Sequence, residues 1–410
     1  MVIYGEDGSP LTISHSEEIY KNMKDPLFLR RYYRLKIAET LRGGGIGGSS
    51  PTDLFIGRYG YPNVYAGPLV PPLFGDTSKL GTPEEWREMQ ISDIVEMRSN
   101  LVRGMELLKV GDVEKGGMAD KIRELALASK PVEAEFEFAR KPYVEQVRGD
   151  DIEPFGPSAM MKRFRLGNVK ADRRMERMHY DTGASSTTAL VELYKKGVLV
   201  SQLQRALSAG LFGLKGKRKF VPTRWSITAV DDTLSKGNLS LVKQNEAVDG
   251  IKAFYSSALD NRWLIFFFPG GWEYESIEAW YPNTSWNEGN GIEISSSYEP
   301  YGGRKKYAEI GGCYYAARLA VSEKLTAMKK QARVLILREV HEGYIMPVGV
   351  WNVREHVRET LQTKPIEIDS MEGAYKMIKA KLEIPRDEWF AQSRILRDTA
   401  RQRRIGDSCT

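Results

Sequence analysis

Two adjacent carboxylates, Asp231 and Asp232, are candidates for catalytic chemistry. They close the segment VPTRWSITAVDD (residues 221–232), whose pattern predicts a loop leading into a strand that ends at the two aspartates. Carboxylates at a strand end can hold Mg²⁺ or Mn²⁺ and activate water for phosphodiester or nucleotide hydrolysis. Because neighbours on a strand point to opposite faces, we expect one aspartate to serve the ion and the other to cap the next element.

Arginine, aromatic and asparagine side chains gather in two segments and suggest a ligand with phosphates and bases. The residues are Arg224 and Trp225 in the segment above and Arg58, Tyr61 and Asn63 in FIGRYGYPNV (residues 55–64). A guanidinium offers phosphate a planar donor fork, aromatic rings stack on unpaired bases, and an asparagine amide reads base edges. The alternative is that the tyrosines fill the core and Arg58 pairs with a carboxylate.

Two further candidates, Arg354 and Glu355, open a predicted helix in the segment WNVRE (residues 351–355). Facing a cleft, Arg354 would hold phosphate and Glu355 would act as an acid or base.

The glycine-rich stretch GGGIGGSSP (residues 43–51) supports two interpretations. Its backbone N–H groups beside Ser49 and Ser50 could cradle a phosphate. Alternatively it connects an N-terminal helical piece to the core, because so many glycines disfavour the interior of a helix or strand.

Positive charge is segregated along the chain. The net charge is +6, whereas residues 162–177 carry a local +5 and residues 215–224 carry five Lys or Arg and no acid. The second cluster contains Lys217, Arg218 and Lys219 beside Trp225. This pattern predicts a basic surface for nucleic acid, the alternative being a solvated face.

Cysteine and histidine are too scarce for several classes of site. Two cysteines, Cys313 and Cys409, and four histidines exclude a four-ligand cysteine zinc site and a disulfide scaffold. We expect a small buried residue at Cys313, no zinc site and a reducing cytoplasm. The longest apolar run, residues 263–269, is too short for a membrane span.

The predicted helices and strands that must position these residues are mixed without strict alternation, which indicates an α+β fold: a mixed, mainly antiparallel sheet with packed helices. The predicted strands are 54–56, 133–138, 261–268, 272–280, 291–296, 334–340 and 344–350, and the last two form a hairpin. The predicted helices are 16–42, 84–108, 118–129, 312–328, 352–361 and a pair within 187–209. We expect an N-terminal helical segment (1–42), a core (43–385, with a subdomain split near 240–260) and a basic helical or disordered tail (386–410).

Five blocks in order along the chain resemble the archaeal Nre family of DNA-repair proteins. They are DLFIGRYGYPNVYAGPL (53–69), VSQLQRALSAGLFG (200–213), VPTRWSITAVDDTLSK (221–236), GGCYYAARLAVSEKL (311–325) and VGVWNVREHVRETL (348–361). The resemblance implies a cytoplasmic archaeal protein that acts on damaged DNA, with the sliding clamp as a partner.

The resemblance also implies a clamp-binding peptide at the C-terminus. Gln402 and Ile405 occupy its first two anchor positions, whereas Ser408 and Cys409 stand where large apolar side chains belong. Such a degenerate motif predicts weakened clamp binding. Relatives also carry clustered N-terminal cysteines, which this chain lacks.

Three functions remain open from the sequence. The first is a DNA-repair protein that binds DNA or nucleotides through a basic, aromatic-lined surface, with metal-dependent phosphodiester hydrolysis or processing of a damaged base. The second is a non-catalytic adaptor that binds DNA and recruits repair factors, and the third is a small-nucleotide-binding enzyme. Aspartates that are buried and paired internally would favour the adaptor.

Overall fold

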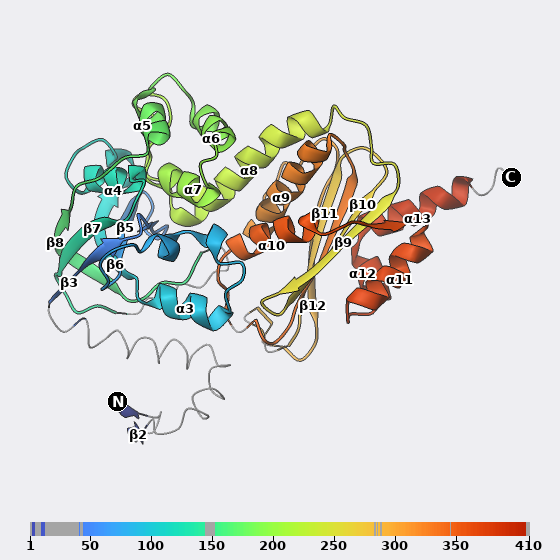
Figure 1. Ribbon diagram of the computed structural model, residues 1–410, viewed down its shortest axis with the longest axis horizontal. Helices are drawn as coiled ribbons and strands as arrows, with labels where there is room; N and C mark the ends of the chain where they lie inside the picture. Colours follow the sequence, from blue (N-terminus) through green and yellow to red (C-terminus); the bar gives the residue numbers. More distant parts are fainter. Residues whose placement is uncertain are drawn as a thin grey trace. The chain divides into compact units, whose positions relative to one another are not determined.

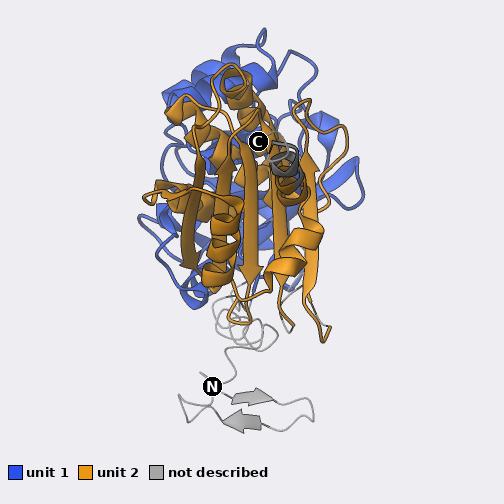
Figure 2. Cartoon of the chain, turned by 90° about the vertical axis from the view of Figure 1, so that its right-hand side faces the viewer, with its two compact units in different colours: residues 1–226, 345–348 blue, residues 227–344, 349–410 orange. Residues whose placement is uncertain are grey.

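The computed structural model describes residues 2–4, 10–12, 41, 44–143, 152–282, 284, 286–287, 289–344 and 346–406. The chain forms two compact units (Figure 2). Unit 1 comprises residues 1–226 and 345–348, and unit 2 comprises residues 227–344 and 349–410. This boundary lies before the 240–260 interval that the sequence suggests.

Unit 1 is built on a six-stranded sheet in the order β3-β7-β8-β6-β5-β4. Its pairs are antiparallel except for β6 with β8, which run parallel. The strands are β3 (Gly45–Ser50), β4 (Leu54–Ile56), β5 (Asn63–Val70), β6 (Val102–Lys109), β7 (Val132–Phe138) and β8 (Ser158–Leu166). Separately, β1 (Val2–Tyr4) pairs with β2 (Pro10–Thr12). The predicted helix over 16–42 lies outside the described residues, except for residue 41.

Among the residues that the structure describes, five α-helices accompany this sheet: α3 (Ile91–Ser99), α4 (Met118–Leu127), α5 (Arg173–Tyr180), α6 (Ser186–Lys195) and α7 (Val200–Ser208). Side chains fix two of the starts, since Asp172 accepts hydrogen bonds from the second and third residues of α5 and Ser185 accepts one from Thr188 of α6. The helix pair α6–α7 and the helix α4 confirm the sequence prediction.

Unit 2 contains a second six-stranded sheet, in the order β12-β11-β13-β10-β9-β14. Only β11 and β13 are parallel neighbours. The strands are β9 (Ile251–Ala258), β10 (Asn261–Phe268), β11 (Glu273–Trp280), β12 (Glu293–Glu299), β13 (Arg333–Val340) and β14 (Ile366–Ile368). As predicted from its apolar sequence, β10 is an inner strand buried on both faces.

Helices cover both faces of the second sheet, and α8–α10 lie on the face opposite α11–α13 (Figure 1). Their bounds are α8 (Thr223–Val242), α9 (Gly312–Met328), α10 (Trp351–Gln362), α11 (Met371–Lys381), α12 (Arg386–Gln392) and α13 (Arg394–Gly406). The α+β prediction is therefore confirmed. No helix in the described part of the chain is long and apolar enough to cross a membrane.

The predicted strand before the two aspartates is wrong, because these residues lie within α8. The β-branched residues Ile227, Thr228 and Val230 favoured a strand in the sequence. However, Ile227, Val230 and Leu234 recur at helical spacing and are all buried. Consecutive helical residues point about 100° apart, so Asp231 and Asp232 face different neighbours.

Three other predictions are wrong for reasons of tertiary packing. Residues 102–108 of the predicted helix 84–108 lie in β6, which pairs with β5 and β8. The hairpin over 334–350 fails because β13 is already paired on both edges, with β10 and β11. Residues 45–50 of the glycine-rich stretch form the strand β3 and not a connector, and a Cβ at Gly48 would lie 1.9 Å from the Pro71 carbonyl oxygen.

The predicted tail also belongs to the body of unit 2. Trp389, Ile395 and Leu396 are buried in the core beneath the sheet. The carboxylate of Glu275 on β11 accepts hydrogen bonds from the Ser393 hydroxyl and from the first two N–H groups of α13. Burial raises the pKa of Glu275, against these bonds, which lower it. A strand carboxylate thus fixes the start of the last helix.

Candidate nucleic-acid interface

Asp231 lies in the interior of unit 2 and is held by an arginine. Arg354 of α10 donates from Nη1 to both carboxylate oxygens, at 2.9 and 2.8 Å, and both side chains are fully buried. Burial raises the pKa of Asp231, and the guanidinium opposes that shift. Burial alone would lower the pKa of Arg354, but Asp231 and Glu355 hold it above its ordinary value. The pair joins α8 to α10.

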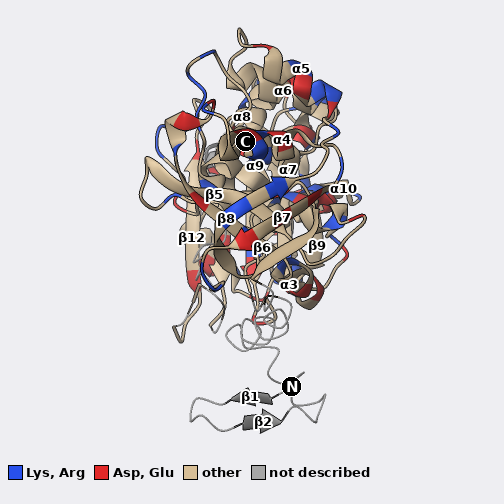
Figure 3. Ribbon diagram, turned by 90° about the vertical axis from the view of Figure 1, so that its left-hand side faces the viewer, with Lys and Arg blue, Asp and Glu red and all other residues tan. Residues whose placement is uncertain are grey.

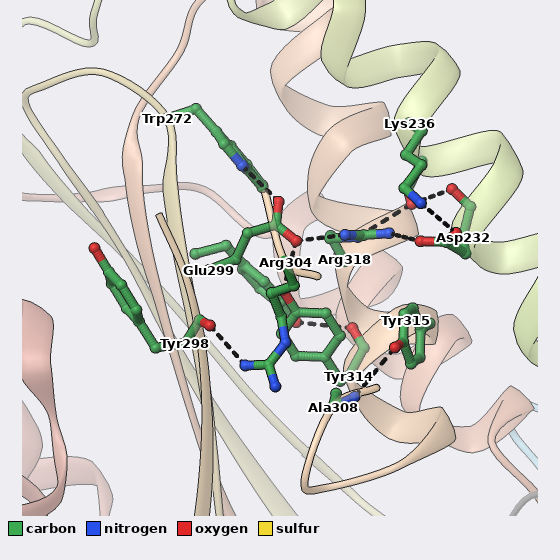
Figure 4. Close-up of polar contacts among 12 residues, drawn as sticks. Asp232, Lys236, Trp272, Tyr298, Glu299, Arg304, Ala308, Tyr314, Tyr315 and Arg318 are labelled. Atoms are coloured by element: carbon green, nitrogen blue, oxygen red, sulfur yellow. Dashed lines mark hydrogen bonds and ion pairs between the residues drawn. The ribbon is translucent and has the colours of Figure 1, made fainter. Parts of the chain in front are cut away.

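Asp232 faces α9 and is only partly exposed. It accepts from Arg318 Nη2 and, at 2.7 Å, from Lys236 (Figure 4). Arg318 also donates to Glu299 of β12 at 2.5 Å, and Glu299 accepts from Trp272 and Tyr314. Asp232 is thus the outer end of a polar network that crosses from α8 through α9 to the sheet.

Glu355 completes the set of carboxylates predicted to be catalytic. It is buried and accepts from Arg358 Nη1 at 2.6 Å, and Arg358 also donates to both oxygens of Glu323 on α9. Each of the three carboxylates is therefore ion-paired with an arginine of unit 2. In the residues that the structure describes, no three or more His, Cys, Asp or Glu side chains form a group suited to a metal ion.

Ser49 and Ser50 are buried in β3 and make internal hydrogen bonds. The Ser50 hydroxyl donates to the Leu69 carbonyl at 2.8 Å, and the Ser49 hydroxyl accepts from the Gly75 N–H at 3.0 Å. Their side chains therefore stabilise the strand and do not line an open phosphate cradle.

The first basic cluster is offset by acids that the sequence places elsewhere. In the β7–β8 ladder, Arg163 pairs with Glu137 and Arg165 with Glu135, at 3.8 and 3.6 Å. Lys or Arg positions and Asp or Glu positions are accordingly interspersed along the ribbon of unit 1 (Figure 3). A local +5 in the sequence does not become a continuous basic surface here.

The second basic cluster separates into one structural residue and exposed lysines. Arg218 is buried, where it donates to the Gly213 carbonyl at 3.0 Å and to the His179 carbonyl at 2.6 Å. Burial lowers the pKa of His179, whose ring contacts Arg218 and the Leu211 carbonyl. Lys217 and Lys219 are exposed, so they alone of these three can face a ligand.

The fold joins this cluster to the aromatic segment at Val110. The Val110 N–H donates to the Pro62 carbonyl and its carbonyl accepts from the Phe220 N–H, both at 2.9 Å. Ile56 N–H donates to the Thr223 hydroxyl at 2.9 Å. Segments about 160 residues apart in sequence therefore lie side by side.

Aromatic rings project from these joined segments. Tyr61 and Trp225 have ring centroids 5.3 Å apart and are 49% and 45% exposed. Tyr59 is 74% exposed, and the Arg58 guanidinium lies over its ring at 5.2 Å. We define the aromatic–basic surface by its members Arg58, Tyr59, Tyr61, Asn63, Lys109, Lys219 and Trp225.

Some residues on and beside this surface were not predicted from the sequence. Lys109 is exposed and is the ladder partner of Asn63, and Tyr65 pairs with Leu107 on the same exposed face. Alternation along β6 could have identified Leu107 and Lys109, but the sequence suggests a helix over 84–108. Arg224 is half-buried beside Trp225. Arg354 lies in unit 2 and does not belong to the surface.

The predicted clamp-binding peptide lies only partly within the described residues. Gln402 and Ile405 lie in α13. Ser408 and Cys409 lie outside the described residues, whereas Cys313 is buried at the start of α9, as expected.

Comparisons with known proteins cover nearly the whole chain. The family model described as archaeal Nre, N-terminal, matches residues 22–287, and that described as archaeal Nre, C-terminal, matches residues 299–407. The chain belongs to the archaeal Nre family. The boundary between these two Nre regions lies inside unit 2, so Asp231 comes from the first region and its partner Arg354 from the second.

Curated relatives within the Nre family carry repair names. A DNA repair protein NreB of Archaeoglobus fulgidus is 38% identical over 359 residues, 87% of this chain and 90% of the relative. A DNA repair protein NreA of Haloferax volcanii is 32% identical over 361 residues, 85% of this chain and 86% of the relative. NreA of Archaeoglobus fulgidus is 33% identical over 345 residues.

Proposed function

We propose that this Nre chain acts in DNA repair by binding DNA through the aromatic–basic surface of unit 1. The names of its relatives support the repair role. The observation that carries the binding role is the exposed ring pair Tyr61–Trp225, which the fold assembles from distant segments next to Arg58. Large exposed rings beside cations suit bases and phosphates together.

The ion pairs of unit 2 favour a binding role over hydrolysis at the predicted carboxylates. A metal ligand or general base needs a free lone pair facing the substrate. Asp231 and Glu355 are buried and engaged by arginines, and Asp232 is engaged by Arg318 and Lys236. The proposal therefore assigns these carboxylates to the stability of unit 2.

The binding proposal is tested through the lysines, which contact phosphate without regard to sequence. Affinity of the full chain for duplex and single-stranded DNA is measured at several salt concentrations, in the wild type and in Lys109→Glu/Lys219→Glu. Because each phosphate contact contributes about 0.7–0.9 to the log–log salt slope, loss of two contacts should make the slope shallower by about 1.4–1.8.

Lys376→Glu/Lys379→Glu on the exposed side of α11 in unit 2 changes the net charge equally and serves as the matched control. It should leave the slope at the wild-type value. No measurable DNA binding by the wild type, or equal slopes for the two double variants, would overturn the proposal.

A further inference from the structure

The exposed rings of unit 1 are held in place. The turn that carries Tyr59 and Tyr61 is closed by a hydrogen bond from the Asn63 N–H to the Gly60 carbonyl at 2.9 Å. Gly60 has φ +80°, and a Cβ there would lie 2.8 Å from the Asn63 carbonyl oxygen, so glycine is required. Trp225 lies in the first turn of the 20-residue helix α8. A ligand therefore meets rings that need little further ordering.

The arrangement of these rings suits bases that are not paired. Tyr61 and Trp225 are inclined by 49°, so neither covers the other as a parallel ring would. In a duplex each base face is covered by its neighbours, and only the edges and the backbone are accessible. Stacking on an aromatic ring requires an unpaired base, and it tolerates any sequence because every base has a π face.

Positive charge lies on the segments that carry the rings and on the segments hydrogen-bonded to them. Arg58 lies over the Tyr59 ring, and Lys109 and Lys219 each precede a residue, Val110 or Phe220, of the backbone hydrogen bond that joins their two segments. Side chains alternate between the two faces of a strand. Glu106 and Lys109 of β6 are three residues apart, so they point to opposite faces. Exposed rings combined with cations are the composition of a surface that binds a single strand.

We propose that the aromatic–basic surface selects unpaired DNA strands by stacking bases on Tyr61 and Trp225, with Tyr59 as an outer ring. This inference rests on the proposed DNA-binding function and specifies its substrate. The interacting groups are ring faces for the bases, and Arg58, Lys109 and Lys219 for the phosphates.

The test compares three probes of equal length, about 12 nucleotides, within the range of single-strand site sizes. They are oligothymidine, a strand with the same sugar–phosphate backbone but no bases, and a duplex. The full chain should bind oligothymidine more tightly than either other probe. Because one base–aromatic stack contributes a factor of roughly 5 to 140 in Kd, Tyr61→Ala or Trp225→Ala should weaken oligothymidine binding by that factor and leave the abasic strand unaffected.

Two variants distinguish stacking from loss of structure. Trp225→Phe retains a ring and should keep most of the preference for oligothymidine, whereas Trp225→Ala should not. Trp286→Ala removes a tryptophan of similar exposure, 47% against 45%, from unit 2 and should change nothing. Circular dichroism and melting temperatures confirm that each variant is folded.

The three probes distinguish a failure of base selection from a failure of DNA binding. Equal affinity for the abasic strand or for the duplex would overturn the selection of unpaired bases while leaving DNA binding intact. Absence of binding to all three probes would overturn the proposed function as well.

Discussion

Replacing Arg354 by methionine should strongly destabilise unit 2, because it leaves the Asp231 carboxylate buried without a partner. An isolated buried carboxylate takes up a proton instead of remaining charged. That uptake costs about 1.4 kcal/mol for each pH unit between an ordinary aspartate pKa near 4 and the pH of the assay. The expected loss is therefore about 4 kcal/mol at pH 7, within the range of about 3–5 kcal/mol for broken buried pairs.

The same reasoning makes the loss depend on pH. At pH 5 the proton uptake costs only about 1.5 kcal/mol, so the destabilisation should shrink by roughly 2.5 kcal/mol between pH 7 and pH 5. The double variant Asp231→Leu/Arg354→Met removes both charges and should recover most of the stability lost in Arg354→Met.

Urea unfolding followed by tryptophan fluorescence is the suitable assay, since six of the eight tryptophans lie in unit 2. Lys236→Met is the control: it removes the exposed partner of Asp232 and should cost less than about 1 kcal/mol. A loss below about 1 kcal/mol in Arg354→Met, or an equal loss at pH 7 and pH 5, would refute the buried charged pair.

Three further predictions concern the architecture. Gly48→Ala should destabilise unit 1 by about 1–3 kcal/mol or more in thermal unfolding, because its Cβ would overlap a carbonyl oxygen, whereas Gly111→Ala, with no atom within 4 Å of the new Cβ, should not. Since the folded state lowers the pKa of His179, unit 1 should lose stability as pH falls below about 6.5, and His179→Gln should have a flatter melting-temperature profile between pH 7.5 and 5.5. In fragments 1–290 and 291–410, cut between the two family regions, the parts of unit 2 should not unfold cooperatively, because the cut divides β11 from β12 and Asp231 from Arg354. Cooperative melting of either fragment's half of unit 2 would contradict that expectation.

Sequence periodicity predicted the elements whose pairing is local or whose pattern is unambiguous. The apolar strand β10 and the helix α9 follow from their own residues, because burial on all sides leaves a continuous apolar pattern. The segment 102–109 and the aspartate-bearing helix α8 do not, since strand partners and core contacts decided between two compatible patterns. Local preference is a weak guide where tertiary packing selects the state.

The candidate site likewise contains residues that the sequence could identify and residues that only the fold reveals. Chemistry in the sequence identified Tyr61, Trp225 and Arg58, and the fold brings the first two into contact. It could not identify which charges remain available, because Arg218 is buried by its own loop and the acids opposite β8 come from another strand. Ion pairs between side chains that are distant in the sequence decide which arginines and carboxylates are structural. A count of charges within one segment does not reveal these pairs.

The most direct measurement of base stacking is the fluorescence of Trp225 during titration with oligothymidine. Trp225 and Trp286 are the substantially exposed tryptophans of the described chain, since the others are at most 8% exposed. Stacking of a base on Trp225 should quench part of the emission in the wild type and in Trp286→Phe, and the quenching should disappear in Trp225→Phe. Quenching that persists in Trp225→Phe, or DNA binding that leaves Trp225 emission unchanged, would contradict the assignment of this surface to unpaired DNA.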